Sequence, residues 1–186
     1  MTLFEYLAIA YALLLSLAAV RLLNGLSYAM SAARRYWAHV SWLWLMLFSA
    51  LLLFWQHWST HALEWTFLTF VMNLAGPGVI YFLACTIVPD EPRRVESWRD
   101  HYFAARHQFF GGLCAWAVLM LTNTTLLLGV PLLHPSRAIP AGLMIVGLSG
   151  FSTDRPVVHA VIPIAVLTIA LFAAAILLQP GSLASV

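Results

Sequence analysis

The sequence predicts an all-α integral membrane protein: a six-transmembrane-helix bundle with a cytoplasmic-side interfacial amphipathic helix. Two observations predict this fold class. The first is composition: 62% of the 186 residues are hydrophobic, 9% are charged, and the mean hydropathy is +0.88. A soluble domain carries about 25% charged residues. The second is that the apolar stretches are long enough to cross a bilayer as helices, and short polar connections separate them. We expect residues 1–186 to form a single polytopic membrane domain.

The first half of the chain contains three predicted spans, at residues 3–26, 36–58 and 65–88. The first has Glu5 where a cleaved signal peptide would have basic residues, so we expect it to remain as a span. The second carries tryptophans mainly toward its two ends, as the interfacial belt of a membrane helix does. The third contains Asn73 followed by a Gly-Pro-Gly break centred on Pro77.

The one long polar segment of the sequence, residues 89–108, divides the chain into two apolar halves. Within it Val95, Trp98, Tyr102 and Phe109 recur at helical spacing, with charged residues between them. This pattern predicts a helix that lies on the membrane surface before the chain enters the bilayer again.

The second half contains predicted spans at residues 109–132, 136–152 and 157–178. The fifth segment is the shortest and includes Pro140 and three glycines, so its sequence leaves open whether it crosses the bilayer completely.

The arginines orient the six predicted spans. With the N-terminus outside, seven arginines fall in cytoplasmic connections and one, Arg137, falls outside; the seven are Arg34, Arg35, Arg93, Arg94, Arg99, Arg106 and Arg155. An excess of basic residues marks the cytoplasmic side. We therefore expect both termini to be periplasmic. The preference for Arg over Lys and the high Ala content are typical of a GC-rich bacterium, so the bacterial inner (cytoplasmic) membrane is the expected location.

Several function classes are disfavoured by absences in the sequence. The middle third of each predicted span lacks Asp, Glu, Lys and Arg, which proton-coupled pumps generally need there. The chain has no Lys for Schiff-base chemistry, and no nucleophile, base and orienting group converge in the sequence. A formal charge of +2 gives no reason to expect nucleic acid as a partner. We expect a protein that is not an enzyme.

Neutral polar residues at mid-membrane depth are the first candidate site. Pro77 lacks an N–H and its ring disturbs the carbonyl of Asn73, so protein groups or water must satisfy the freed backbone. Thr122 and Asn123 lie at similar depth on the fourth predicted span. We expect the third and fourth spans to pack together with Asn73 and Asn123 facing the bundle interior, where they either clamp the kink or line a solute site.

Arg21 and Asn24, near the far end of the first span, are the second candidate site. They are suited to a lipid phosphate or another anionic group. Alternatively, Arg21 extends its head to the cytoplasmic interface, with Glu96 or Asp100 as an acidic partner.

Histidines near the outer ends of the spans are a weaker candidate. His57, His61, Glu64 and His134 are residue types that bind divalent metals. Haem is the other possibility, with an outer histidine paired to His134 and, at the inner side, His39 paired to His159. The metal motif is incomplete and histidines are common at interfaces, so we expect no metal and no cofactor.

These observations leave three function classes. The first is a non-enzymatic membrane accessory, scaffold or lipid-contacting module. The alternatives are a passive channel or transporter for a small neutral solute, and a metal- or haem-binding membrane protein that uses the outer histidines. Membrane lipids are the expected partners, together with a possible protein partner or a second copy of the chain.

Overall fold

The computed structural model describes residues 3–31, 35–176 and 178. These residues form six α-helices and three 3₁₀ turns, and they contain no strand. The elements in chain order are α1 (Leu3–Ala29), α2 (Trp37–Gln56), η1 (His57–Thr60), α3 (Phe67–Ile87), η2 (Pro92–Arg94), α4 (Trp98–Leu126), η3 (Pro135–Arg137), α5 (Ala138–Ser152) and α6 (Pro156–Ile176). The all-helical prediction is confirmed.

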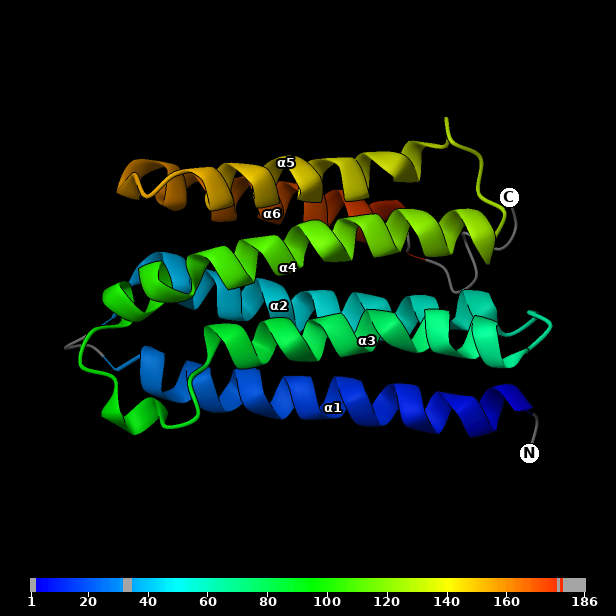
Figure 1. Ribbon diagram of the computed structural model, residues 1–186, viewed down its shortest axis with the longest axis horizontal. Coiled ribbons are helices and arrows are strands. Elements are labelled where there is room, and N and C mark those ends of the chain that lie inside the picture. The colour runs from blue at the N-terminus through cyan, green and yellow to red at the C-terminus, as the bar shows by residue number, and fades with distance from the viewer. Residues whose placement is uncertain (1–2, 32–34, 177, 179–186) are drawn as a thin grey trace.

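The six helices run up and down along a common axis, so the bundle has two distinct ends (Figure 1). The terminal end holds both chain termini and the α2–α3 and α4–α5 connections, which contain η1 and η3. The arginine end holds the α1–α2, α3–α4 and α5–α6 connections; its described arginines are Arg21, Arg35, Arg93, Arg94, Arg99, Arg106 and Arg155. These two names are used below.

Five of the described helices are long and apolar enough to cross a membrane: α1, Trp37–Thr60, Phe67–Arg94, α4 and α6. At 15 residues, α5 is shorter than the other five. Large apolar side chains cover the outside of the bundle; Phe67 is 82% exposed and Val157 is 75% exposed. A soluble protein would bury such side chains, whereas lipid solvates them. A helical membrane bundle therefore fits both the lengths and the surface.

The second part of the polar segment, from Trp98, forms one helix with the fourth span, which corrects the predicted separation into an interfacial helix at 89–108 and a span at 109–132. α4 is continuous from Trp98 to Leu126. The predicted apolar face is present, since Trp98, Tyr102 and Phe109 are all buried. The same face continues into Leu113 and Trp116, and α4 remains helical through Gly111 and Gly112, so no separate surface helix is formed.

Local sequence signals explain where α3 begins and α4 ends. Thr66 caps α3: its Oγ1 accepts a hydrogen bond from the Thr69 N–H at 3.2 Å, and Thr69 Oγ1 accepts one from the Thr66 N–H at 2.8 Å. The predicted break at Pro77 leaves α3 a single helix with Pro77 buried inside it. α4 ends six residues earlier than the predicted boundary at 132, because Gly129 adopts a positive φ of 65° that turns the chain.

Aromatic packing fills the core at the arginine end. The Trp42 ring of α2 meets the rings of Phe109 and Phe110 of α4 edge-on, at centroid distances of 4.9 and 5.5 Å. Helix α5 lies close against α4, since a Cβ added at Gly150 would lie 2.4 Å from the Phe110 ring. Aromatic side chains therefore fill the core at this end of the bundle.

Candidate functional site

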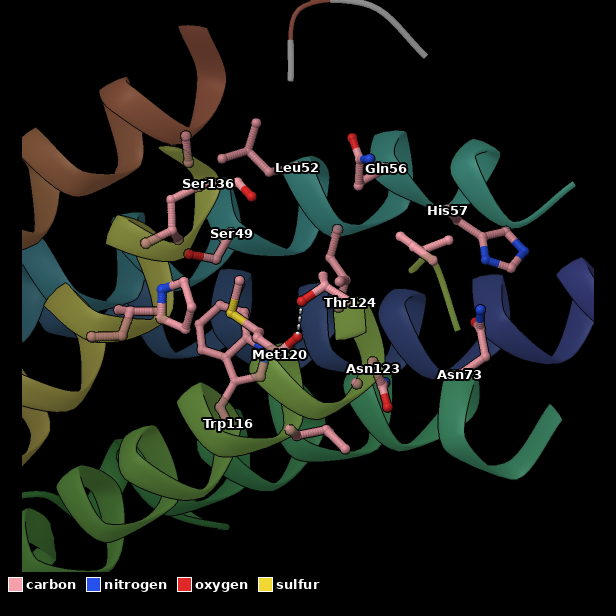
Figure 2. Close-up of a pocket in the computed structure, with 18 of the residues that line it drawn as sticks. Ser49, Leu52, Gln56, His57, Asn73, Trp116, Met120, Asn123, Thr124 and Ser136 are labelled. Carbon is pink, nitrogen blue, oxygen red and sulfur yellow. Dashed lines mark hydrogen bonds between the residues drawn. The ribbon is translucent and has the colours of Figure 1, made fainter. Parts of the chain in front are cut away.

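A cavity of about 170 Å³ lies at the terminal end, between α2 and α4, and every one of the six α-helices contributes to its lining (Figure 2). The lining residues are Tyr11, Ser49, Leu52, Leu53, Gln56, His57, Thr60, Asn73, Gly76, Trp116, Leu119, Met120, Asn123, Thr124, Leu127, Leu128, Ser136, Ile139, Pro140, Leu143, Val166, Ile169, Ala170 and Ala173. Among these residues there is no Asp, Glu, Lys or Arg.

The divergence of α2 and α4 explains why space remains at this end. At the arginine end the two helices meet through Trp42 and the phenylalanines of α4. Toward the terminal end, small residues face the interior, including Gly76 of α3 and Ala170 and Ala173 of α6. A Cβ added at Gly76 would be no closer than 3.7 Å to Leu53. The larger side chains of the lining therefore stop short of filling the space.

The cavity has two chemically different walls. The wall from α5 and α6 consists of apolar residues: Ile139, Pro140, Leu143, Val166, Ile169, Ala170 and Ala173. The opposite wall, from α2, η1, α3 and α4, mixes leucines with neutral polar side chains: Ser49, Gln56, His57, Thr60, Asn73, Trp116, Asn123 and Thr124. A molecule with one apolar face and one polar edge matches this arrangement.

The predicted packing of the third and fourth spans is confirmed by a hydrogen bond from the Asn123 side chain of α4 to the backbone of α3. Asn123 Nδ2 donates a hydrogen bond to the Met72 carbonyl of α3 at 2.8 Å. Asn73, one residue later, is buried and lies beside the His57 ring (Figure 2). The two asparagines thus line the same cavity from α3 and α4, and the interhelical hydrogen bond joins Asn123 to the backbone rather than to the Asn73 side chain.

Three lining side chains carry a buried polar atom that makes no hydrogen bond within the described part of the chain. These atoms are Gln56 Oε1, Trp116 Nε1 and Asn123 Oδ1. Leaving a buried polar atom unpaired costs about 1–3 kcal/mol. The polar wall therefore retains hydrogen-bonding capacity that the fold itself does not use.

Arg137 lies next to the cavity without lining it. Its guanidinium donates hydrogen bonds to the Pro131 carbonyl at 3.1 Å, the Leu121 carbonyl at 3.3 Å, the Val130 carbonyl and Thr124 Oγ1. The arginine thereby satisfies carbonyls at the C-terminal end of α4 and ties η3 to that end.

The remaining members of the central candidate site lie outside the cavity lining. The Thr122 hydroxyl donates back to the Val118 carbonyl at 2.9 Å, within its own helix. Pro77 is buried in α3, and its neighbour Gly76 is the residue that reaches the cavity. Thr124, two residues beyond Thr122, takes the position at the wall.

Arg21 and Asn24 lie at the arginine end, away from the cavity. Arg21 Nη2 donates to Asp90 Oδ1 at 2.5 Å and to the Val88 carbonyl at 2.9 Å. The acidic partner is therefore an acid of the polar segment, as expected, but it is Asp90 rather than Glu96 or Asp100, because Asp90 follows directly on the end of α3 beside α1. Asn24 is exposed, and its carbonyl accepts a hydrogen bond from Ser27.

The outer histidines are not gathered into a metal site. His57 is buried and stacks on Tyr11 at a centroid distance of 3.9 Å, and His61 stacks on the exposed Trp58. His134 instead pairs with Ser136. In the described part of the chain no three His, Cys, Asp or Glu side chains lie close enough together to hold a metal ion, and this includes Glu64.

The inner pair of histidines lies in packed surroundings. His159 uses both ring nitrogens, since Nδ1 contacts the Tyr102 hydroxyl at 2.9 Å and Nε2 contacts the Thr153 carbonyl at 2.8 Å. His39 is buried against the Trp98 ring. His159 therefore has no nitrogen free for an axial bond to haem.

Several cavity residues were missed in the sequence: Tyr11, Gln56, Trp116 and Ser136, together with Arg137, which contacts the lining residue Thr124. One signal for them is present. Trp116, Met120, Asn123 and Leu127 follow each other at spacings of four, three and four, which places them on one face of α4.

Comparison with known proteins gives no relative. No protein-family model, curated protein or solved structure matches the chain.

Proposed function

We propose that this chain is a non-enzymatic membrane module that binds a small, uncharged, largely apolar molecule in the cavity at the terminal end. The observation that carries the proposal is the cavity itself, with an apolar wall on one side, unpaired neutral polar atoms on the other, and no charged side chain in its lining. Ligand sites are typically concave and mainly apolar, with a few polar groups that fix orientation.

The cavity size sets the scale of the ligand. An apolar cavity of about 150 Å³ in another protein holds benzene. The cavity of about 170 Å³ therefore suits a compact molecule of a single ring or similar bulk. The absence of charged lining groups disfavours ions, because a buried ion without a partner is strongly destabilised.

Binding accounts for the structure better than passive passage does. A channel needs a route through both ends, and the arginine end is packed with Trp42, Phe109 and Phe110. The cavity therefore serves as a pocket in this conformation, and the module acts as a receptor or carrier for its ligand within the membrane.

Binding can be tested with toluene and the purified protein in detergent micelles, by ligand-observed NMR. Ala170→Phe fills the cavity from α6 and should abolish the protein-dependent signal. Ala175→Phe is the matched control, because this exposed alanine lies on the same helix. Equal signals from the two variants would contradict the proposal.

We further propose that all six helices cross a bacterial inner membrane with both termini in the periplasm. The support is that every described arginine except Arg137 lies at the end of the bundle opposite to the start of α1 and the end of α6. Labelling of single cysteines in intact cells tests the orientation, after Cys85 and Cys114 have been replaced. A cysteine replacing the exposed Glu64 should react with an impermeant reagent, and one replacing the exposed Glu96 should stay unlabelled. The reverse pattern would overturn the orientation.

A further inference from the structure

We infer that the ligand of this cavity is a hydrogen-bond donor: an uncharged molecule that carries an O–H or N–H group on an apolar body, such as an alcohol, a phenol or an amide. The inference rests on the proposed function and specifies its ligand class. It follows from which donors and acceptors of the polar wall already make hydrogen bonds within the protein.

The hydroxyl groups of the lining have largely used their protons. Tyr11 donates to the Leu53 carbonyl at 3.2 Å, Thr60 to the His57 carbonyl at 2.7 Å, and Thr124 to the Met120 carbonyl at 2.7 Å, the bond drawn in Figure 2. Ser136 donates to Nδ1 of His134 at 2.8 Å, because that nitrogen already accepts from the Ser136 N–H. A hydroxyl that has donated its one proton keeps lone pairs, so these four groups remain acceptors.

The two amides beside the cavity have each used one of their two N–H donors. Asn123 Nδ2 donates to the Met72 carbonyl, and Gln56 Nε2 donates to Ser59 Oγ. Their oxygens, Asn123 Oδ1 and Gln56 Oε1, are buried and make no hydrogen bond with any described residue. Both contribute unpaired acceptors to the polar wall.

Donors also remain in the wall, but none of them pairs with the two amide oxygens. Trp116 Nε1–H is unpaired, and Ser49 makes no side-chain hydrogen bond within the described residues. The Asn73 amide lies against the His57 ring. A ligand that only accepts, such as an ether, would leave the two amide oxygens of the wall unpaired. An acyl chain from the bilayer would leave all of it unpaired.

The net charge of the ligand follows from the same wall. A cation would meet lone pairs, but in the lining there is no carboxylate to balance its charge. Burying an ion without a counter-charge is strongly unfavourable, whereas a neutral O–H or N–H loses much less hydration. The wall therefore fits an uncharged donor.

Three probes of similar shape test the ligand class: phenol, which donates; anisole, which only accepts; and toluene, which does neither. Affinities are measured by ligand-observed NMR in micelles and corrected for partition into detergent, with Ala170→Phe as the blank. Phenol should bind about fivefold more tightly than toluene, the effect of one net hydrogen bond, and anisole should show no such gain.

Substitution of an acceptor locates the effect. Gln56→Met keeps the side-chain length but removes an unpaired oxygen, so the preference for phenol should fall while toluene affinity stays constant. Gln108→Met, at an exposed position on α4, should leave both affinities unchanged. The comparison of probes on the unsubstituted protein stands even where a variant folds poorly.

Each alternative outcome has a distinct meaning. Equal affinity for all three probes, or a preference for anisole, overturns the donor class and leaves the binding function intact. Signals that are the same in the unsubstituted protein and in Ala170→Phe overturn both the donor class and the proposed function.

Discussion

The two ends of this bundle are built from the same six helices and are packed in opposite ways. At the arginine end, aromatic rings pack tightly against each other and against a glycine: the Phe110 ring contacts the Trp42 ring and Gly150. At the terminal end the side chains stop short of one another and leave a cavity, which Gly76 borders with room to spare. Close packing is the ordinary state of a protein interior. The terminal end, which contains the cavity, is therefore the one that requires a functional explanation. The closely packed arginine end supports it.

The largest expected effect on stability comes from removing a large buried side chain at the arginine end. Phe110→Ala should lower the free energy of unfolding by about 3–5 kcal/mol, because the ring is fully buried and its loss creates a cavity. Leu119→Ala, at a half-buried residue beside the existing cavity, should be less destabilising. Thermal denaturation in detergent measures both. Equal losses would mean that the two ends do not differ in packing.

Adding one methyl group tests the same contrast in the other direction. Gly150→Ala should destabilise the fold by about 1–3 kcal/mol, since the new Cβ would lie 2.4 Å from the Phe110 ring. Gly76→Ala adds the same group where the nearest atom is 3.7 Å away, so it should be neutral or stabilising. The two variants share the gain in helix propensity, which cancels in the comparison. If both variants melt at the same temperature, the assigned close contact is wrong.

Loss of the buried hydrogen bond between Tyr102 and His159 at the arginine end should give an intermediate effect. Tyr102→Phe removes the hydroxyl that contacts His159 Nδ1 at 2.9 Å and leaves that nitrogen buried and unpaired. We expect a loss of about 1–2 kcal/mol in the free energy of unfolding. Tyr6→Phe, at an exposed tyrosine, serves as the control and should change little. An unchanged stability for Tyr102→Phe would show that this hydrogen bond contributes nothing to the free energy of unfolding.

The smallest effect is expected at the terminal end. Asn123→Leu removes the hydrogen bond to the Met72 carbonyl, and interhelical hydrogen bonds in membranes contribute about 0.6–1.7 kcal/mol. The apolar leucine also fills part of the cavity, which offsets some of the loss. Chemical denaturation in mixed micelles can resolve this difference. A loss larger than that of Phe110→Ala would reverse the comparison between the ends.

The helices follow from the sequence because hydropathy and breakers decide them locally. The capping threonines before α3 and the Gly129 turn after α4 act within a few residues. The start of α4 was placed too late, since the change from charged to apolar residues near Phe109 suggested a boundary, although nothing there interrupts the helical hydrogen bonds.

The cavity depends on relations between distant segments, which the sequence does not state. The shared polar face of Asn73 and Asn123 could be predicted, because unpaired polar groups in a membrane need each other or the backbone. Trp116 and Gln56 join that face only because α2 and α4, which meet at Trp42 and Phe109, come together in the folded bundle. The partner of Arg21 was missed for the same reason, as it depends on the position of Asp90 after α3.

The shortness of α5 has a consequence for the surrounding bilayer. A helix of 15 residues rises about 22 Å, against about 30 Å for the hydrocarbon core. If α5 crosses the membrane as we propose, thinning of the lipid next to it would match the bilayer to the height of the short helix. The protein would then fit best among lipids with short acyl tails, and the thinned region would lie beside α5 and η3 on one flank of the bundle.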